Sequence, residues 1–316
     1  MGLELIVMTS LVLLWMAKTT SAGLNVSLAK EGCQAWCGGI RIPYPFGIGA
    51  NCYINAMYSV ECRRDKLYLT LLTGIKLEVL NMSVDSFAQF NGFAQVNNPI
   101  LSRSCPGGNG SSDVVHGNTI VDLTGSPFTF SERSNVFISV GCNNHASVTN
   151  LVDRTTAQCI SICDGSPDRD NSCFGINCCQ TTPPGNLSYH LRVFNVNLSR
   201  IETYNQSGGV HEPCMYAFLV DKDWFRYNLT DPFAIRGMDH VPAMLEWNLF
   251  TMEPSQLGIP KYGGGSCGKE LYEPSSNIHG VYCFCYSGYE GNPYLPYGCR
   301  GTFILGSSLL YFKVHL

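Results

Sequence analysis

Residues 33–47 read CQAWCGGIRIPYPFG, a stretch with two cysteines, three glycines, two prolines and three aromatic side chains. Glycine and proline interrupt regular helices, because glycine loses much backbone entropy on ordering and proline lacks an N–H donor. Glycine, proline and cysteine are frequent throughout the 316-residue chain, which has 32 Gly, 16 Pro and 16 Cys. The pattern predicts short strands joined by turns and long connections.

Upstream of this stretch lies a segment typical of a secretory leader. An apolar run from Leu5 to Ala17 has about the length of a signal-peptide core, and small residues follow at Thr20-Ser21-Ala22. We therefore expect a signal peptide over residues 1–22 and a mature chain that starts near Gly23. A buried N-terminal helix or strand is the alternative interpretation.

Asn-X-Ser/Thr sequons favour the same extracellular destination. Such sequons mark surface segments in secreted proteins, and none of those in this chain has proline at X. The predicted glycosylation sites are Asn25, Asn81, Asn109, Asn186, Asn197, Asn205 and Asn228.

The even number of cysteines predicts a disulfide framework in a secreted chain. Neither paired Cys-X2-Cys units nor a Cys/His box with structural-zinc spacing occurs, so we expect no metal and no cofactor. Adjacent cysteines rarely bond to each other because the geometry is strained. Cys178 and Cys179 should therefore reach two separate partners.

Alternating apolar residues predict strands in several places. The runs Leu67–Leu71 and Ile75–Val79 flank Gly74, which suggests a hairpin. Further strands are expected at 136–140, 189–193 and 215–220, whereas 239–250 fits either a short helix or a strand. The expected fold class is mostly β, a disulfide-rich multi-module extracellular protein with long loops.

Charge and motifs narrow the function. A net charge of −4 gives no basic field for nucleic acid. The sequence lacks a nucleophile elbow, a His-Glu-X-X-His motif, a phosphate-binding loop and a kinase signature, and its seven histidines are scattered. We therefore expect no catalytic residues and no enzyme. A hydrolase with two carboxylates brought together by the fold remains the minority alternative.

The best candidate site is the segment from Cys33 to Lys76, which interleaves cations with aromatic side chains. Guanidinium groups suit sugar carboxylates, and aromatic faces suit sugar rings. Between Cys33 and Cys105 six basic residues stand against four acidic ones, which slightly favours an acidic ligand. The alternative is a solvated Arg63-Arg64 turn beside a small core of Tyr44 and Phe46. The predicted ligand-binding residues are Trp36, Arg41, Tyr44, Arg63, Arg64 and Lys66.

Several motifs occur in a recognisable order. They are CQAWCGGIRIPYPFG at 33–47 with Cys52 and Cys62, PFTFS at 127–131, NVFISVGC at 135–142, CFGINCCQTTPPG at 173–185, CMYAFLV at 214–220, and CFCYSGYEGNPY at 283–294 with Cys299. Together they resemble the ectodomain of plant wall-associated receptor kinases, with its galacturonan-binding module and the second half of an EGF-like unit. The tethering membrane helix and the kinase motifs of that family are not found in this sequence.

The resemblance implies a protein that binds acidic cell-wall polysaccharide, such as pectin or oligogalacturonides, without catalysis. Its implied modules are galacturonan-binding over 23–105, a second β-rich cysteine-containing module over 106–262 and a partial EGF-like unit over 263–300, followed by an unrelated apolar tail over 301–316. The EGF-like pattern implies the pairs Cys267–Cys283 and Cys285–Cys299, and no calcium site.

The resemblance also implies a location. We expect a secreted protein of the apoplast and cell wall, or of the plasma membrane if the chain is part of a longer receptor, with membrane attachment only through a part missing here. The alternatives are a protein-interaction or decoy module that meets receptor ectodomains, and a secreted glycan hydrolase.

Overall fold

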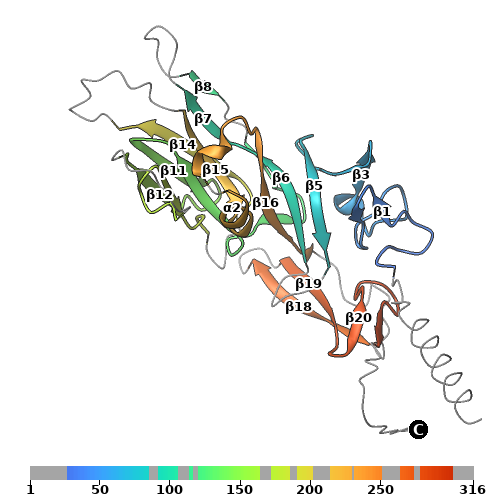
Figure 1. Ribbon diagram of the computed structural model, residues 1–316. Coiled ribbons are helices and arrows are strands. Elements are labelled where there is room, and N and C mark those ends of the chain that lie inside the picture. Colours follow the sequence, from blue (N-terminus) through green and yellow to red (C-terminus); the bar gives the residue numbers. More distant parts are fainter. Residues whose placement is uncertain are drawn as a thin grey trace, which may run out of the picture.

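A computed structural model describes residues 27–84, 92–105, 114–116, 120–163, 172–185, 191–201, 214–229, 231–250, 264–273 and 278–301. The predicted signal peptide and tail lie outside these residues, apart from Gly301. The described chain is mostly β, as predicted, and forms an elongated molecule with short helices only (Figure 1). No helix in the described part combines the length and apolarity needed to span a bilayer.

Two antiparallel sheets form the body of the molecule. The six-stranded sheet has the order β3 (Val60–Arg63), β4 (Lys66–Thr70), β5 (Lys76–Ser83), β6 (Phe93–Pro99), β16 (His240–Trp247), β9 (Phe128–Phe130). The five-stranded sheet has the order β13 (Cys178–Thr181), β10 (Asn135–Val140), β15 (Met215–Asp221), β7 (Ser102–Cys105), β8 (Val114–His116).

Smaller sheets extend this body at both ends (Figure 1). One has the order β12 (Thr156–Ser161), β11 (Asn144–Asn150), β14 (Phe194–Arg200), and another β17 (Leu249–Phe250), β19 (Ile278–Cys285), β18 (Gly265–Glu273). Two-stranded ribbons pair β1 (Trp36–Cys37) with β2 (Ile40–Arg41) and β20 (Tyr289–Gly291) with β21 (Cys299–Gly301). The helices are α2 (Lys222–Asn228), η1 (Ala56–Tyr58) and η3 (Pro232–Ile235).

The predicted hairpin is confirmed in β4 and β5. Leu67 and Leu69 of β4 lie on the buried face with Leu77 and Val79 of β5, and the register pairs Leu69 with Leu77. Gly74 adopts the positive φ that the connecting turn requires. The alternation was sufficient here because only one face of these strands is buried.

The apolar runs at 136–140 and 215–220 are also confirmed as strands, and every residue of β15 is buried. The undecided segment 239–250 forms strands, because β16 lies between β6 and β9 and buries Val241, Ala243 and Leu245.

The strand expected over 189–193 is wrong in its position. β14 begins only at Phe194, and residues 186–190 lie outside the described part. The carbonyls of Leu191 and Arg192 instead accept backbone hydrogen bonds from Phe130 and Leu123. These bonds attach the segment to the chain near β9 without extending a ladder.

The modules expected over residues 23–105 and 106–262 share a sheet in the structure. The six-stranded sheet joins strands from both sides of residue 105, because β6 pairs with β16. The Cys105–Cys214 disulfide also crosses that position. The expected boundary at 105 therefore does not separate the sheets, and the boundary at 262 lies outside the described residues.

An aromatic core connects the N-terminal hairpins to the C-terminal segment 278–301. The ring of Trp247 lies edge-on to Phe46 with centroids 5.1 Å apart, and the centroid of the Tyr294 ring lies 5.4 Å from that of Trp247. The Tyr58 hydroxyl donates a 2.6 Å hydrogen bond to the carbonyl of Asn248. Phe46 is therefore a core residue, as one of the two interpretations from the sequence held.

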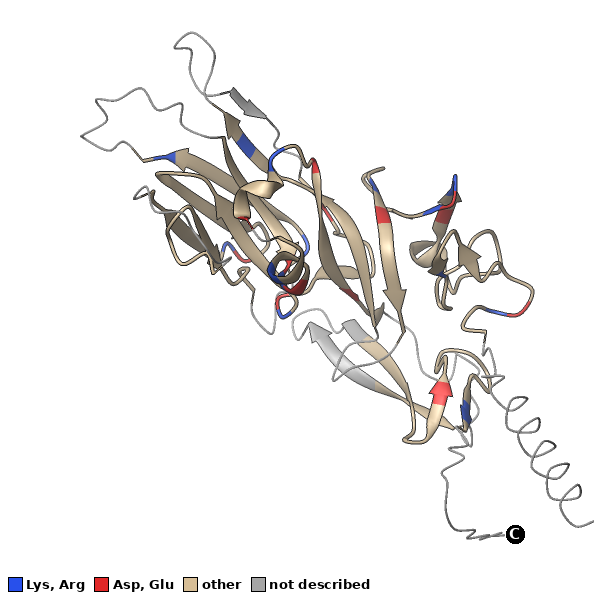
Figure 2. Cartoon of the chain, in the orientation of Figure 1, with Lys and Arg blue, Asp and Glu red and all other residues tan. Residues whose placement is uncertain are grey.

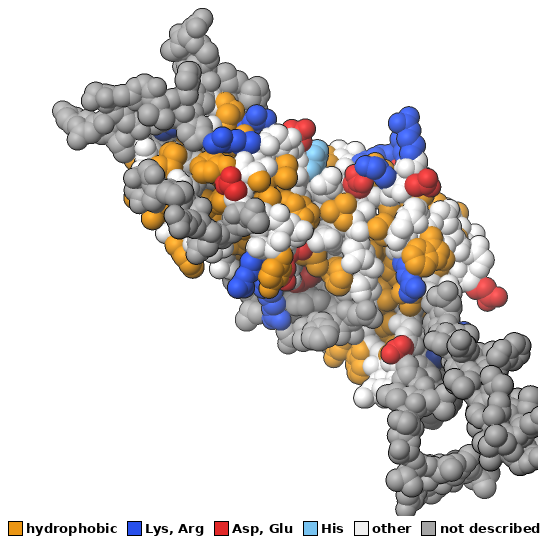
Figure 3. All heavy atoms as spheres, viewed as in Figure 1, with side chains coloured by type: hydrophobic (Ala, Val, Ile, Leu, Met, Phe, Trp, Pro, Cys, Tyr) orange, Lys and Arg blue, Asp and Glu red, His pale blue; other side chains and the backbone are white. Residues whose placement is uncertain are grey.

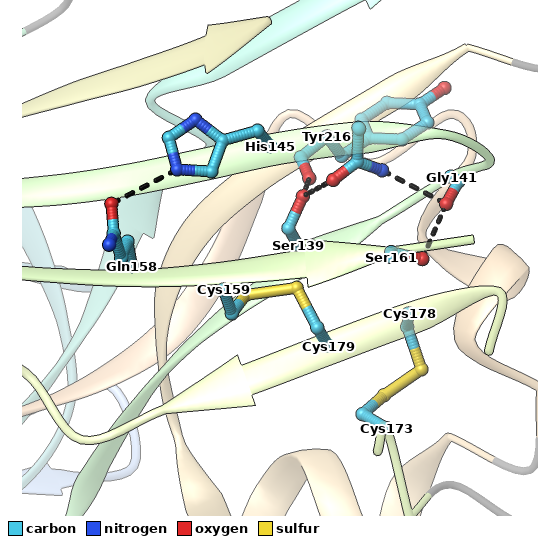
Figure 4. Close-up of a disulfide and its surroundings, with 11 residues drawn as sticks. Ser139, Gly141, His145, Gln158, Cys159, Ser161, Cys173, Cys178, Cys179 and Tyr216 are labelled. Atoms are coloured by element: carbon cyan, nitrogen blue, oxygen red, sulfur yellow. Dashed lines mark hydrogen bonds between the residues drawn. A yellow bond between two sulfur atoms is a disulfide. The ribbon is translucent and has the colours of Figure 1, made fainter. Parts of the chain in front are cut away.

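All sixteen cysteines are paired in disulfides. Cys178 bonds Cys173 and Cys179 bonds Cys159, so the adjacent cysteines have separate partners, as predicted (Figure 4). Next to them, the Ser161 hydroxyl donates to the Gly141 carbonyl at 2.7 Å. Near the C-terminus, Cys267 bonds Cys283 and Cys285 bonds Cys299, the two pairs that the resemblance implied.

Candidate functional site

The candidate site is built on two hairpins that touch at their turns. The β1–β2 turn contains Gly38 with φ +55°, and a Cβ atom there would lie 2.2 Å from the carbonyl oxygen of Asp65 in the β3–β4 turn. The Cys37–Cys62 disulfide joins β1 to β3 beside this contact. Only glycine fits at position 38, because any side chain there would clash with the Asp65 carbonyl. Gly38 therefore allows the two turns to approach this closely.

Trp36 and Arg41 form the exposed pair of the first hairpin. They are cross-strand partners, and the Arg41 guanidinium carbon lies 4.8 Å from the Trp36 ring centroid. Trp36 is 47% exposed, and Arg41 is exposed as well. Among the described residues Arg41 belongs to no ion pair, so the stacked guanidinium keeps its hydrogen-bond donors available to a ligand.

Two glutamates partly neutralise three of the other basic side chains, Arg63, Lys66 and Lys76. Glu61 binds both Arg63 and Lys76, and Lys66 lies 2.9 Å from Glu78. Hydrogen bonds from Lys76 and then Arg63 lower the pKa of Glu61, and the bond to Glu78 raises the pKa of Lys66. These cations therefore add less positive field than the sequence count implied.

Arg64 and Tyr44 differ in what they offer a ligand. Arg64 and Asp65 form the β3–β4 turn with positive φ values, and Arg64 is exposed without an ion pair in the described part. The Tyr44 side chain is only partly exposed and packs against the core, and this burial raises its pKa. Arg64 thus fits both the solvated-turn and the ligand interpretation, whereas Tyr44 leans toward the core.

Charged residues of both signs lie close together on β3 and β5 (Figure 2), and charged side chains are visible on the surface in that part of the molecule (Figure 3). Sequence reasoning counted Glu61 and Glu78 in the charge balance but missed that they pair with the cations. The alternation of β3, β4 and β5 contains that signal, because the register aligns Glu61 with Tyr68 and Tyr68 with Glu78 on one face.

A carboxyl pair lies elsewhere, between β9 and β16. Burial, followed by the charges of Glu246 and Asp153, raises the pKa of Glu132 to about 7. Burial also raises the pKa of Glu246, whose carboxylate accepts a hydrogen bond from the Ser131 hydroxyl. The Glu132 Oε1 atom is buried without a hydrogen-bond partner, and a Cβ on Gly185 would lie 1.7 Å from it.

Within the described residues, no three His, Cys, Asp or Glu side chains gather as metal ligands. Of the predicted glycosylation sites, Asn81, Asn197 and Asn228 lie on exposed positions of β5, β14 and α2. Asn25, Asn109, Asn186 and Asn205 lie outside the described residues.

Comparison with known families matches two parts of the chain. Residues 33–90 match the family described as "Wall-associated receptor kinase galacturonan-binding", and residues 170–256 match "Wall-associated kinase". The first match contains both hairpins of the candidate site. No solved structure matches the chain significantly.

Curated relatives extend the match over most of the chain. Wall-associated receptor kinase 2 of Arabidopsis thaliana is 32% identical over 86% of this chain and 34% of the relative. Wall-associated receptor kinase-like 1 is 32% identical over 88% of this chain and 39% of the relative, and wall-associated receptor kinase-like 10 is 29% identical over 88% and 40%. This chain therefore spans less than half the length of these relatives. Over most of its own length, the chain is similar in sequence to these wall-associated receptor kinases, which is consistent with an ectodomain of that kind.

Proposed function

We propose that this chain is an extracellular, non-catalytic module that binds de-esterified galacturonan, the acidic component of pectin. The observation that carries the proposal is the exposed Trp36–Arg41 pair, whose guanidinium has no carboxylate partner in the described part of the chain. The match of residues 33–90 to a galacturonan-binding family supports the same ligand.

The chemistry of the pair fits an acidic sugar. A planar guanidinium donates two parallel hydrogen bonds to one carboxylate, and stacking on Trp36 orients it in advance. The exposed indole offers an apolar surface to the C–H groups of a sugar ring. Arg64 would add a second cation, in the β3–β4 turn that touches the β1–β2 turn.

The test is binding of the glycosylated, oxidised protein to polygalacturonate, measured by calorimetry with Trp36→Ala and Arg41→Ala variants. Loss of the charged contact should weaken binding about tenfold, and binding of the unmodified protein should weaken as salt rises. Arg226→Ala is the matched control, because Arg226 lies 5.7 Å from the Tyr227 ring in another exposed pair on α2.

Two results would contradict the proposal. One is equal affinity of the Arg41→Ala and Arg226→Ala variants. The other is affinity for a neutral glucan that equals the affinity for polygalacturonate at low salt.

The proposal includes no catalysis. Glu132 and Glu246 are the carboxyls that a hydrolase hypothesis would use, but Glu132 packs against Gly185 and Glu246 is bound to Ser131. Incubation with oligogalacturonides should release no shorter products, as measured by chromatography. Turnover that is lost in a Glu132→Gln variant would support the hydrolase instead.

A protein-binding role is the second candidate, and one observation favours it. Phe174 is 85% exposed beside the exposed Ile160, Ile162 and Ile176. The Cys159–Cys179 and Cys173–Cys178 disulfides hold these side chains on a rigid support. A receptor ectodomain that binds here should be retained without pectin and lost in a Phe174→Ser variant.

A further inference from the structure

The EGF-like unit displays an aromatic stripe, defined here as Tyr282, Phe284 and Tyr286. The three alternate along β19 and the turn after it, so they point to one face while Val281 and Cys283 are buried on the other. Ring centroids lie 6.4 Å apart for Tyr282 and Phe284, and 5.9 Å apart for Phe284 and Tyr286. Phe284 is 37% exposed and Tyr286 45%.

The neighbouring strand explains why the stripe is uncovered. Across from Tyr282 and Phe284, β18 provides Gly268 and Ser266, and the Gly264 carbonyl accepts a hydrogen bond from the Tyr286 amide. A Cβ on Gly268 would lie 2.5 Å from the Tyr282 ring. The tyrosine therefore leans over bare backbone, and directly opposite Tyr282 and Phe284 the strand β18 offers only Gly268 and Ser266.

The stripe is also held rigidly. Disulfides Cys267–Cys283 and Cys285–Cys299 brace the strand that carries it. On the opposite face, the buried Tyr294 hydroxyl accepts a hydrogen bond from the Cys283 amide, and Tyr294 packs on Trp247 of the central core. A preorganised surface loses little conformational entropy when a ligand binds.

We propose that the aromatic stripe is a second saccharide-binding surface, which takes uncharged, methyl-esterified stretches of galacturonan. Contiguous exposed rings mark interaction sites. The stripe contains neither aliphatic nor charged side chains, unlike the Ile-rich surface around Phe174. Ring faces carry negative potential that attracts the C–H groups of a pyranose, while the tyrosine hydroxyls reach its hydroxyl groups.

The ligand class rests on the proposed function, but the two sites use different forces. The Trp36–Arg41 pair needs a carboxylate and is weakened by salt, whereas ring stacking does not depend on ionic strength. Contact at both sites would let one module bind a polymer in which acidic and esterified stretches alternate.

The experiment measures binding of the full oxidised chain to fully methyl-esterified galacturonan at about 0.5 M NaCl, where the Debye length is about 4 Å. The unmodified protein should bind, and Phe284→Ser/Tyr286→Ser should bind at least about fivefold more weakly. Tyr227→Ser is the matched control, since it removes an exposed ring on α2, away from the stripe. Phe284→Tyr keeps a ring and should retain binding.

Two sets of variants, each tested on both polymers, separate this inference from the proposed function. Trp36→Ala/Arg41→Ala should lose low-salt binding to polygalacturonate yet keep binding to the esterified polymer, and the stripe variant should show the reverse. Absence of binding of the esterified polymer by the unmodified protein overturns the inference whatever polygalacturonate does. Equal binding by the stripe variant and the Tyr227→Ser control also overturns it.

Discussion

The side-chain amide of Asn292 donates a 2.6 Å hydrogen bond to the backbone carbonyl of Tyr44, 248 residues earlier in the chain. The same Nδ2 atom donates to the Leu28 carbonyl at 2.6 Å, and Asn292 is completely buried. One residue of the C-terminal segment thus binds both the start of the described chain and the segment that carries the candidate site. The two modules are fixed to each other.

Asn292→Ala should therefore destabilise the protein. It removes the Asn292 donor from the Tyr44 carbonyl and the acceptor of the Tyr294 amide, whereas the Leu28 carbonyl keeps the Tyr44 amide as a donor. Each buried group left unsatisfied costs about 1–3 kcal/mol. We expect a lower midpoint of thermal unfolding and a lower free energy of unfolding in urea. Asn195→Ala, at an exposed position of β14, should leave both unchanged. Equal stability of the two variants would show that the modules do not depend on this contact.

Disulfides should differ in their contribution according to loop length. Cys105–Cys214 closes a loop with a sequence separation of 109, whereas Cys173–Cys178 has a separation of 5. The chain-entropy model gives at most about 5 kcal/mol for the first and about 2 kcal/mol for the second. The variant Cys105→Ala/Cys214→Ala should unfold at clearly lower urea than Cys173→Ala/Cys178→Ala, and the reverse order would contradict the entropic explanation.

Local features of the fold could be predicted, because their signals are local. Alternation located β4 and β5, and adjacency alone separated the partners of Cys178 and Cys179. The pairing of β6 with β16 had no such signal, since it joins residues about 145 positions apart through non-local packing. For this reason the modules looked sequential in the sequence but interlock in the structure.

The candidate site was predicted as a composition and not as a geometry. Pairing of Trp36 with Arg41 depends on the register that the Gly38 turn sets. The ion pair of Glu61 with Lys76 depends on the registers of β3, β4 and β5, which bring the two side chains together across β4. The aromatic stripe is exposed because small residues of β18 lie opposite it. The sequence of β19 alone does not reveal that β18 is its partner strand.

Two adjacent arginines provide a test of the ion-pair argument. Arg63 is bound to Glu61, whereas Arg64 has no ion pair in the described residues. Arg64→Ala should therefore reduce affinity for polygalacturonate more than Arg63→Ala, by about two- to fivefold for an exposed charge. Each substitution removes one positive charge, and the two positions are adjacent in the chain. The difference between their affinities for polygalacturonate therefore measures the effect of the Arg63–Glu61 ion pair. A larger loss for Arg63→Ala in calorimetry would place the ligand on the paired cation.

The raised pKa of Glu132 makes stability depend on pH in a defined direction. Its pKa is about 7 in the folded protein and near the ordinary 4.5 when unfolded, so the folded state binds the proton more tightly. This contribution to stability is complete below about pH 4.5 and is lost as pH rises to about 7. Glu246, Asp153 and Arg133 are the charged groups that act on this carboxyl, and Arg133 opposes the shift.

Thermal unfolding of the protein and a Glu132→Gln variant between pH 4.5 and 8 measures the effect. The glutamine stays neutral, so the stability of the variant relative to the parent should rise across that interval. Because the carboxyl is only half-buried, solvent screening limits the change to on the order of 1 kcal/mol. Glu290→Gln, at an exposed position of β20, should run parallel to the parent. A difference between Glu132→Gln and its parent that stays constant with pH would mean that Glu132 is ionised throughout, and hence that the carboxyl is solvated rather than packed against Gly185.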